Sequence, residues 1–257
     1  KSFLIFIFVF ISLFILGLFD DKFSLSPIKR LIVISFLVYI LCTTDYSLNI
    51  DNLNFFFLNF EINFKQLSKP FTLVCFIFLI ISLNMFDGIN LQSAIFYLTN
   101  FITILILTNS YNPILLSIII GLIFFSYLNY KNKCFLGDSG TYLLSFLLGY
   151  YLIRLHNNYD VVFTDDIVNI LFLPIIDSIR VIIKRMSINK EIFLPDNSHL
   201  HHRLLKKFGY EKTISLITFM IIIPQIALFL GLSSLFIFLF QVIIYFFSII
   251  ISKNASY

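Results

Sequence analysis

The feature that most constrains this chain is a series of long apolar runs separated by short polar segments. A helix needs about 17–25 mostly apolar residues to cross a bilayer. Nine runs are candidates for such helices: 2–19, 29–45, 70–86, 91–109, 112–130, 139–154, 167–183, 213–230 and 235–252. The chain is 59% hydrophobic and only 12% charged, with a mean hydropathy of +0.96. This composition excludes an ordinary soluble domain, and it predicts an all-α polytopic membrane protein with about nine transmembrane helices.

Two segments between or within the runs predict further structure. The last two runs belong to one uncharged stretch, in which Gly231-Leu-Ser-Ser234 is the expected turn. From Leu58 to Lys65 apolar and polar residues alternate, which predicts a half-buried strand. Paired with residues 48–55, this strand would form a small β-hairpin near 48–65 on the outer face. No internal repeat or linker divides the chain, so we expect a single domain, 1–257.

Lys and Arg are distributed unequally between the two sides that nine alternating helices define. If the loop after Asp20-Asp21 is cytoplasmic, then the loops 84–90, 131–138 and 184–212 and the C-terminal tail are also cytoplasmic. These regions, with Arg180 at the inner end of the seventh run, hold 14 of the 18 Lys and Arg residues. Because short loops rich in Lys and Arg remain in the cytoplasm, the asymmetry supports this orientation.

Four polar clusters interrupt the runs, and all of them fall on that side. They are Asp20-Asp21, Asn84-Met-Phe-Asp87-Gly-Ile-Asn90, Gly137-Asp138-Ser139-Gly140 and His199-Leu-His201-His202. Carboxylates, amides and histidines at one face of an apolar bundle indicate an enzyme acting at a membrane surface. A transporter or lipid-handling protein is the alternative, but a transporter would place ionisable groups near the middle of its helices.

Each of the first three clusters also has a purely structural interpretation. Asp20-Asp21 marks a helix end, although adjacent carboxylates repel unless a cation or basic group joins them. The segment 84–90 resembles a helix C-terminus that a glycine ends. In the third cluster Asp138 or Ser139 would serve as an N-cap, while the same helix N-terminus would also suit a phosphate.

The histidine cluster is the most specific of the four. Three histidines within four residues, followed by Arg203, indicate an anion site or a metal site, and the alternative is a plain basic loop. Asp177 and Arg180, three residues apart near the inner end of the seventh run, are expected to pair on one helix face. Together the clusters offer carboxylates for Mg²⁺ and cations for phosphate, which suits phosphoryl transfer with a lipid as one substrate.

In their order and spacing, these motifs resemble those of the polyprenyl-phosphate N-acetylhexosamine-1-phosphate transferases, of the glycosyltransferase family 4 type. The resemblance covers nearly the whole chain and also includes Pro174-Ile-Ile-Asp177 and Pro195-Asp196. The His-x-His-His form is more similar to the branch that transfers GlcNAc-1-phosphate from UDP-GlcNAc to undecaprenyl phosphate than to the branch with three consecutive histidines.

The resemblance implies a role for each cluster. It implies Asp138 as the ligand of Mg²⁺, or of Mn²⁺ in its place, with Asn84 as a helper. It implies catalytic roles for Asp20, Asp21 and Asp87, the first two in handling metal or polyprenyl phosphate. Residues implied in substrate binding are Asn90, His199, His201, His202 and Arg203, the last four within the cytoplasmic substrate-binding loop 184–212.

The implied reaction transfers a HexNAc-1-phosphate, with GlcNAc favoured, from a UDP-sugar to undecaprenyl phosphate, with release of UMP. The product would initiate a lipid-linked cell-envelope glycan such as O-antigen, at a bacterial inner membrane with the active site facing the cytoplasm. The expected partners are the UDP-sugar, the polyprenyl phosphate and the bilayer; a homodimer is compatible with the sequence, and no nucleic acid is expected. A catalytically inactive relative is a further alternative.

The chain departs from the family pattern at two places. Asn90 stands where the family usually has Asp, which keeps the hydrogen bonding but removes the charge. The first residue is Lys1 rather than Met, and the similar proteins carry about two more N-terminal helices, so we expect an N-terminal portion to be missing.

Overall fold

The computed structural model describes residues 2–57, 59–108, 111–158, 162–189 and 198–253. Within these ranges, one long helix corresponds to each predicted apolar run. The long helices are α1 (Ser2–Phe23), α2 (Pro27–Thr44), α3 (Ser68–Phe86), α4 (Gln92–Thr108), α5 (Pro113–Tyr130), α6 (Gly137–Asn158), α7 (Thr164–Ser187), α9 (Tyr210–Phe229) and α10 (Ser234–Lys253). The predicted helical class is therefore confirmed.

Six helices in the described ranges are long and apolar enough to cross a membrane, namely α1, α2, α3, α5, α9 and α10, and α4 is apolar but shorter. Helices α6 and α7 do not meet that criterion. Helix α6 packs between α1, α3 and α4, so its hydroxyls bond inside the bundle, as Ser145 does with Tyr97 at 2.8 Å. A central helix can therefore be more polar than one that faces lipid, and the count of nine crossings stays a prediction.

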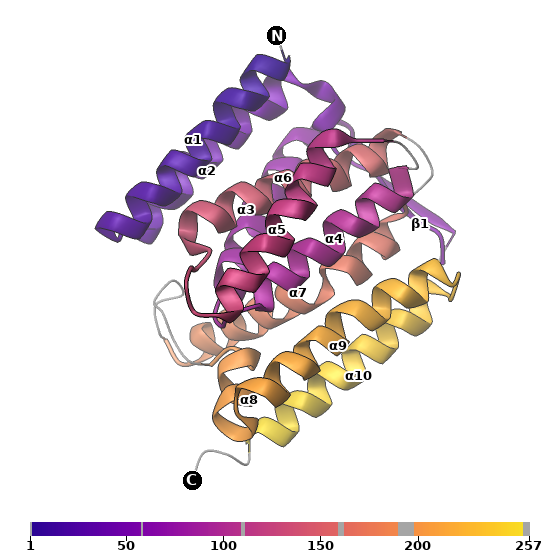
Figure 1. The fold of residues 1–257 in the computed structure, drawn as a ribbon. Coiled ribbons are helices and arrows are strands. Elements are labelled where there is room, and N and C mark those ends of the chain that lie inside the picture. Colours follow the sequence, from indigo (N-terminus) through magenta and orange to yellow (C-terminus); the bar gives the residue numbers. More distant parts are fainter. Residues whose placement is uncertain (1, 58, 109–110, 159–161, 190–197, 254–257) are drawn as a thin grey trace.

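The predicted hairpin is present as an antiparallel pair, β1 (Asn52–Phe55) and β2 (Phe60–Asn63). Its register pairs Leu53 with Ile62 and Phe55 with Phe60. All four residues of β2 are exposed, so the prediction that this strand is half-buried is wrong, because no element of the described ranges packs over it on either face. Figure 1 shows the hairpin at one end of the bundle, while the turn after α1, the short helix α8 (Leu200–Phe208) and the C-terminus lie towards the other. The polar clusters and the hairpin therefore occupy opposite ends.

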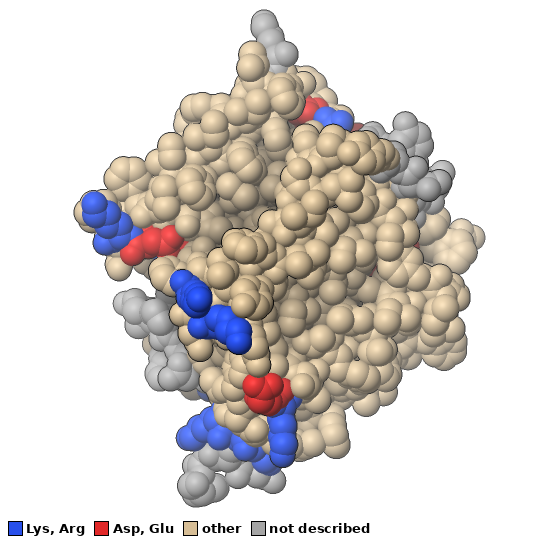
Figure 2. All heavy atoms as spheres, viewed as in Figure 1, with Lys and Arg blue, Asp and Glu red and all other residues tan. Residues whose placement is uncertain are grey.

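The surface of the bundle is largely apolar. Helices α1, α2, α5 and α10 expose large side chains such as Phe8, Phe36, Phe124 and Phe247. In Figure 2 the visible charged groups gather mainly at the lower left, and a broad uncharged face separates them from a small charged group at the upper right. Lipid is the solvent that tolerates such a face, which agrees with a multi-pass membrane protein.

Two boundaries differ from the sequence-based expectation. Helix α1 continues to Phe23, so Asp20 and Asp21 lie in its last turns rather than in a loop. Their carboxylates find partners on other elements, which permits the helix to continue. The predicted loop 184–212 contains a helix, α8, whose N-cap is His199. Gly231, at φ +72°, lies in the turn between α9 and α10 where it was predicted.

Candidate active site

A cavity of about 330 Å³ opens at the end of the bundle where the polar clusters gather. Its walls come from the ends of α1, α3 and α5, the loops that follow α3 and α5, and the first turn of α6. The lining residues are Asp21, Asn84, Asp87, Gly88, Ile89, Asn90, Asn129, Phe135, Leu136, Gly137 and Asp138. The fold therefore brings three of the four predicted clusters together around one space.

Asp20 is buried beside this cavity and is fully engaged by protein groups. Its Oδ2 accepts hydrogen bonds from Arg30 at 2.9 Å and from the Tyr142 hydroxyl at 2.7 Å, and its Oδ1 accepts one from the Leu25 backbone N–H. The Arg30 guanidinium also lies 3.9 Å from Asp138 Oδ2. Asp20 thus fixes Arg30 near the Asp138 carboxylate.

Asp21 caps the N-terminus of α6 from another helix. Its two oxygens accept hydrogen bonds from the backbone N–H groups of Asp138, at 2.7 Å, and of Ser139, at 3.2 Å. Gly137 adopts φ +68°, and a Cβ there would lie 2.8 Å from Asp21 Oδ2, so glycine is required for this approach. The sequence predicted that the N-terminus of α6 would hold a phosphate or be capped by its own side chains. A carboxylate of α1 occupies it instead.

Asn84 connects the second and third clusters. Its amide donates hydrogen bonds to Asp138 Oδ1 and, at 3.0 Å, to the Thr141 hydroxyl. Thr141 in turn donates to the backbone carbonyl of Asp138. These bonds hold the Asp138 carboxylate at the cavity wall, next to the last turn of α3.

Asp87 follows α3 as its C-cap and lines the same cavity. Burial raises the pKa of Asp87 to about 6, and the nearby carboxylates of Asp138 and Asp21 contribute in the same direction. Its ionised and protonated forms are therefore both accessible near neutral pH. Such a group suits a proton acceptor or a ligand for a cation that relieves the repulsion.

Asn90 lines the cavity, but its side chain is turned towards the loop between α5 and α6. Its Nδ2 donates to Asn132 Oδ1, and its Oδ1 accepts from Asn129 at 3.4 Å. Asn129 also accepts from the Leu91 backbone N–H at 2.6 Å. The Asn90 amide therefore links two loops at the rim.

The donor set around the cavity fits the Mg²⁺ that the resemblance implies. No three His, Cys, Asp or Glu side chains of the described residues are grouped closely enough to hold a metal by themselves. Mg²⁺ does not need such a group, because it usually binds one or two carboxylates and completes its shell with water and substrate phosphate. Asp138 and Asp87 supply carboxylates, and Asn84 supplies an amide. The same oxygen donors fit Mn²⁺.

His199 is held by the predicted pair on α7. Asp177 and Arg180 pair at 2.7 Å, as expected. Asp177 Oδ2 lies 2.8 Å from His199 Nδ1, and both of its oxygens accept from the Leu200 backbone N–H at 3.2 Å. A carboxylate can only accept, so Nδ1 carries a proton and Nε2 is the ring nitrogen left to meet a ligand.

His201 joins the histidine cluster to the cavity. It packs against Gly88 so closely that a Cβ at Gly88 would overlap its ring. Its Nδ1 lies 3.3 Å from the Gln92 amide nitrogen, which makes Nδ1 the acceptor and Nε2 the protonated nitrogen. Burial lowers the pKa of His201 to about 3, and the neighbouring His202 adds to this shift, so the ring is neutral at physiological pH.

The remaining members of the cluster face other neighbours. The His202 ring lies 4.3 Å from that of His201, centroid to centroid. Arg203 donates to the Ile249 carbonyl at 3.5 Å, and Lys207 donates to the Ile251 carbonyl at 2.7 Å. Both basic side chains thus reach the C-terminal turns of α10, where the helix dipole favours cations. Pro195 and Asp196 of the predicted substrate loop lie outside the described residues.

The sequence-predicted residues thus gather at one end of the bundle, but not in one cavity. Asp21, Asn84, Asp87, Asn90 and Asp138 line the cavity, and the histidines adjoin it through Gly88. Gln92 and Tyr245, which contact the histidine cluster or its support, were not predicted from sequence. Tyr245 carries a polar hydroxyl inside an apolar run and Gln92 is a polar residue at the start of one, and these positions are the signal by which they could have been found.

The chain is also similar to known proteins. The family profile described as "Glycosyl transferase family 4" matches residues 3–156. The chain belongs to this family of membrane transferases.

Two curated relatives define the resemblance further. A Bacillus subtilis (strain 168) protein named "Probable undecaprenyl-phosphate N-acetylglucosaminyl 1-phosphate transferase" is 28% identical over 81% of this chain and 59% of its own length. A Thermotoga maritima protein named "Undecaprenyl-phosphate alpha-N-acetylglucosaminyl 1-phosphate transferase" is 30% identical over 90% of this chain and 70% of its own length. The match therefore spans about three fifths of the first relative's length and about seven tenths of the second's.

Proposed function

We propose that this protein transfers a HexNAc-1-phosphate, with GlcNAc favoured, from a UDP-sugar to undecaprenyl phosphate and releases UMP. The observation that carries the proposal is the convergence of Asn84, Asp87 and Asp138 in one cavity that adjoins His201, at the charged end of an apolar bundle. The names of the two relatives give the same acceptor and the same sugar.

In the proposed reaction, an oxygen of the lipid phosphate forms a bond to the sugar-linked phosphorus. The bond from that phosphorus to the oxygen it shares with the UMP phosphate breaks, and UMP leaves with the electron pair. Asp87 accepts the proton of a singly protonated lipid phosphate, whose second pKa near 6 resembles that of Asp87, about 6. Asp138 and Asn84 would hold Mg²⁺, which neutralises phosphate charge when bound.

The other groups of the site would position the donor. Arg30 presents a cation beside Asp138, and Nε2 of His199 is the ring nitrogen free of the Asp177 contact, whereas Nε2 of His201 is buried against Gly88. We propose that the histidine cluster binds the diphosphate or sugar of the nucleotide from one side of the cavity. The acceptor would then enter from the bilayer side.

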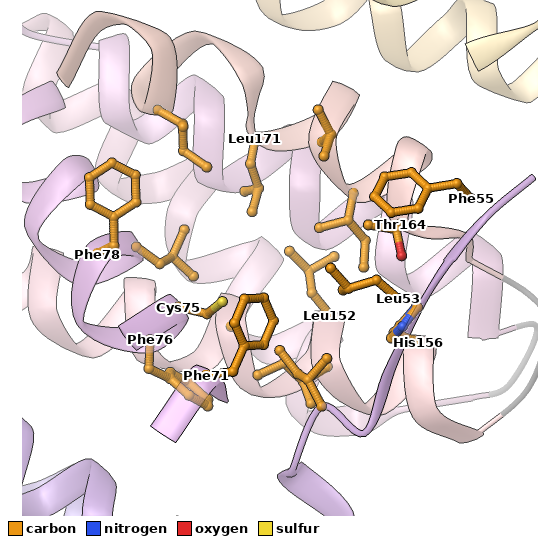
Figure 3. A pocket seen from close by; sticks show the side chains of 17 residues that line it. Leu53, Phe55, Phe71, Cys75, Phe76, Phe78, Leu152, His156, Thr164 and Leu171 are labelled. Carbon is orange, nitrogen blue, oxygen red and sulfur yellow. The ribbon is translucent and has the colours of Figure 1, made fainter. Parts of the chain in front are cut away.

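An apolar cavity in the half of the bundle nearer the hairpin supports a lipid acceptor. It measures about 300 Å³ and lies between β1, α3, α6 and α7, where Phe71, Cys75, Leu152 and Leu171 converge on it (Figure 3). Leu79, also in its wall, precedes Asp87 by eight residues of chain, about 12 Å along a helix. An isoprenoid chain with its phosphate at Asp87 would be long enough to reach it.

The decisive experiment incubates the purified protein with labelled UDP-GlcNAc, undecaprenyl phosphate and Mg²⁺. We expect a lipid-linked sugar and UMP in equal amounts, and their loss in Asp138→Ala. Glu211→Ala, which removes an exposed carboxylate outside the site, is the matched control. An active Asp138→Ala protein would contradict the metal assignment. Nucleotide binding without product for any UDP-HexNAc would instead identify an inactive relative.

The location follows from the same orientation. We propose that the protein lies in a bacterial plasma membrane with this cavity facing the cytoplasm, where UDP-sugars are made. The charge asymmetry of the loops supports that direction. Cysteines introduced singly at Lys133 and at Asn63, on opposite ends of the bundle, should differ in labelling by an impermeant thiol reagent added to intact cells. Labelling at Lys133 from outside would contradict the orientation.

A further inference from the structure

Tyr245 is a tyrosine on the last helix that contacts the support of the histidine cluster without lining the cavity. Its side chain is fully buried, and its ring packs edge-on against Phe172 of α7. Its hydroxyl lies 2.8 Å from Asp177 Oδ1 and 2.6 Å from Arg180 Nε. Since Arg180 can only donate, the hydroxyl accepts a hydrogen bond from Arg180 and donates one to Asp177.

The Asp177 carboxylate is thereby fixed from several directions. Oδ1 accepts from Tyr245 and from Arg180 at 2.7 Å, which leaves Oδ2 to accept from His199 at 2.8 Å. Arg180 also donates to the Ser198 carbonyl at 2.8 Å. The hydroxyl of α10 thus sets the position of both α7 side chains that contact the start of α8.

Helix α10 holds α8 at a second place as well. Arg203 and Lys207 of α8 donate to the carbonyls of Ile249 and Ile251, in the last turns of α10. Lys207 thereby pairs one of the carbonyls that a helix end leaves without a helical partner, whereas the Ile249 carbonyl also accepts from the Ser252 hydroxyl at 2.8 Å. Helix α8 is therefore attached to α10 through its own basic side chains and, by way of Tyr245 and Asp177, at its N-terminus.

We propose that Tyr245 is a positioning residue, which orients the His199 ring and the N-terminus of α8 for the donor substrate through Asp177. The inference rests on the proposed function, because it takes His199 to contact the nucleotide-sugar. Helix α10, far along the chain from the residues of the carboxylate cavity, then controls donor affinity. A hydroxyl with a purely structural role would affect stability without affecting the donor selectively.

The test compares Tyr245→Phe with a control on the same pair of helices. Gln241, one turn earlier on α10, donates to the Asn169 carbonyl of α7 at 2.9 Å and has no contact with Asp177 in the described structure. Tyr245→Phe removes the two buried hydrogen bonds of the hydroxyl to Asp177 and Arg180 of α7, and Gln241→Met removes one buried hydrogen bond between the same two helices. Only the first should alter the KM for the donor.

For Tyr245→Phe we expect the KM for UDP-GlcNAc to rise about five- to tenfold, the effect of about one ordinary hydrogen bond. The KM for undecaprenyl phosphate and kcat should stay within about twofold of wild type on the same reasoning. Replacement of Tyr245 by para-aminophenylalanine, which restores a donor, should recover donor affinity. Wild-type kinetics in Tyr245→Phe, or an equal change in Gln241→Met, would overturn the inference.

A measurement without turnover separates this inference from the proposed function. In protein labelled with ¹⁵N-histidine, the Nδ1 proton of His199 should give a downfield resonance, which His199→Gln removes. Tyr245→Phe should shift this resonance, and Gln241→Met should not. If wild-type protein makes no lipid-linked product but the resonance shifts, the proposed function fails and the positioning contact stands. If Tyr245→Phe does not accumulate, Asp177→Asn must shift the same resonance, and an unchanged resonance there refutes the link.

Discussion

Replacing Gly17 by alanine is expected to separate α1 from α6 and to impair catalysis. A Cβ at Gly17 would lie 2.7 Å from the Asp138 carbonyl carbon and closer still to the Ser139 backbone. Ordinary contact begins near 3.4 Å, so α1 must retreat by at least the difference of 0.7 Å, because backbone atoms cannot rotate away. Overpacking of this kind commonly costs about 1–3 kcal/mol.

The same displacement acts on Asp21, one turn further along α1. Its bond to the Ser139 N–H is already 3.2 Å long, and a shift of this size takes it beyond hydrogen-bond distance. A bond to a charged group contributes about 1.5 kcal/mol at the low end, which suits an exposed carboxylate. Expressed in the transition state, that loss lowers kcat/KM roughly tenfold.

The assay measures lipid-linked product formation and thermal unfolding in the same detergent. Gly121→Ala on α5 is the matched control, because a Cβ there meets nothing within 4 Å. We expect the control to retain wild-type activity, with stability equal to or slightly above wild type, since alanine favours a helix. Wild-type stability and kcat/KM in Gly17→Ala would refute the reasoning that α1 packs against the α6 N-terminus.

Three further predictions concern other parts of the molecule. Gly88→Ala should displace His201, which lowers donor affinity roughly tenfold and costs about 1–3 kcal/mol of packing energy. Unchanged UDP-GlcNAc binding, measured by calorimetry, would contradict this prediction. Burial raises the pKa of Asp87 to about 6, so kcat/KM should fall about tenfold per pH unit below that value as the carboxylate protonates. Added Mg²⁺ should move this acidic limb of the pH profile to lower pH. A flat profile from pH 7 to 5 would exclude Asp87 as an ionised participant. Arg154→Met breaks a partly exposed ion pair with Asp45 at the hairpin end, so it should lower the free energy of unfolding by at most about 1 kcal/mol and leave kcat unchanged. A large loss of activity would refute the separation of this ion pair from the active site.

The helical class, the hairpin and the gathering of the polar clusters could be predicted from sequence because each depends on local patterns. Apolar run length specifies a helix in lipid, alternation specifies a strand, and a one-sided excess of Lys and Arg specifies orientation. The roles of Asp20 and Asp21 could not be distinguished, since the two residues are adjacent and chemically identical. Only packing turns Asp20 towards Arg30 and Asp21 towards the α6 backbone.

The sequence by itself determined that this chain is a helical membrane protein of its family, with its polar clusters at one end. The tertiary structure decided which of those residues share a cavity, because Asn84 and Asp138 are 54 positions apart and meet only when α3 packs on α6. It also decided that Tyr245 supports His199 by way of Asp177. Hydropathy records how each residue partitions into lipid, whereas hydrogen bonds between helices depend on which faces are buried against one another.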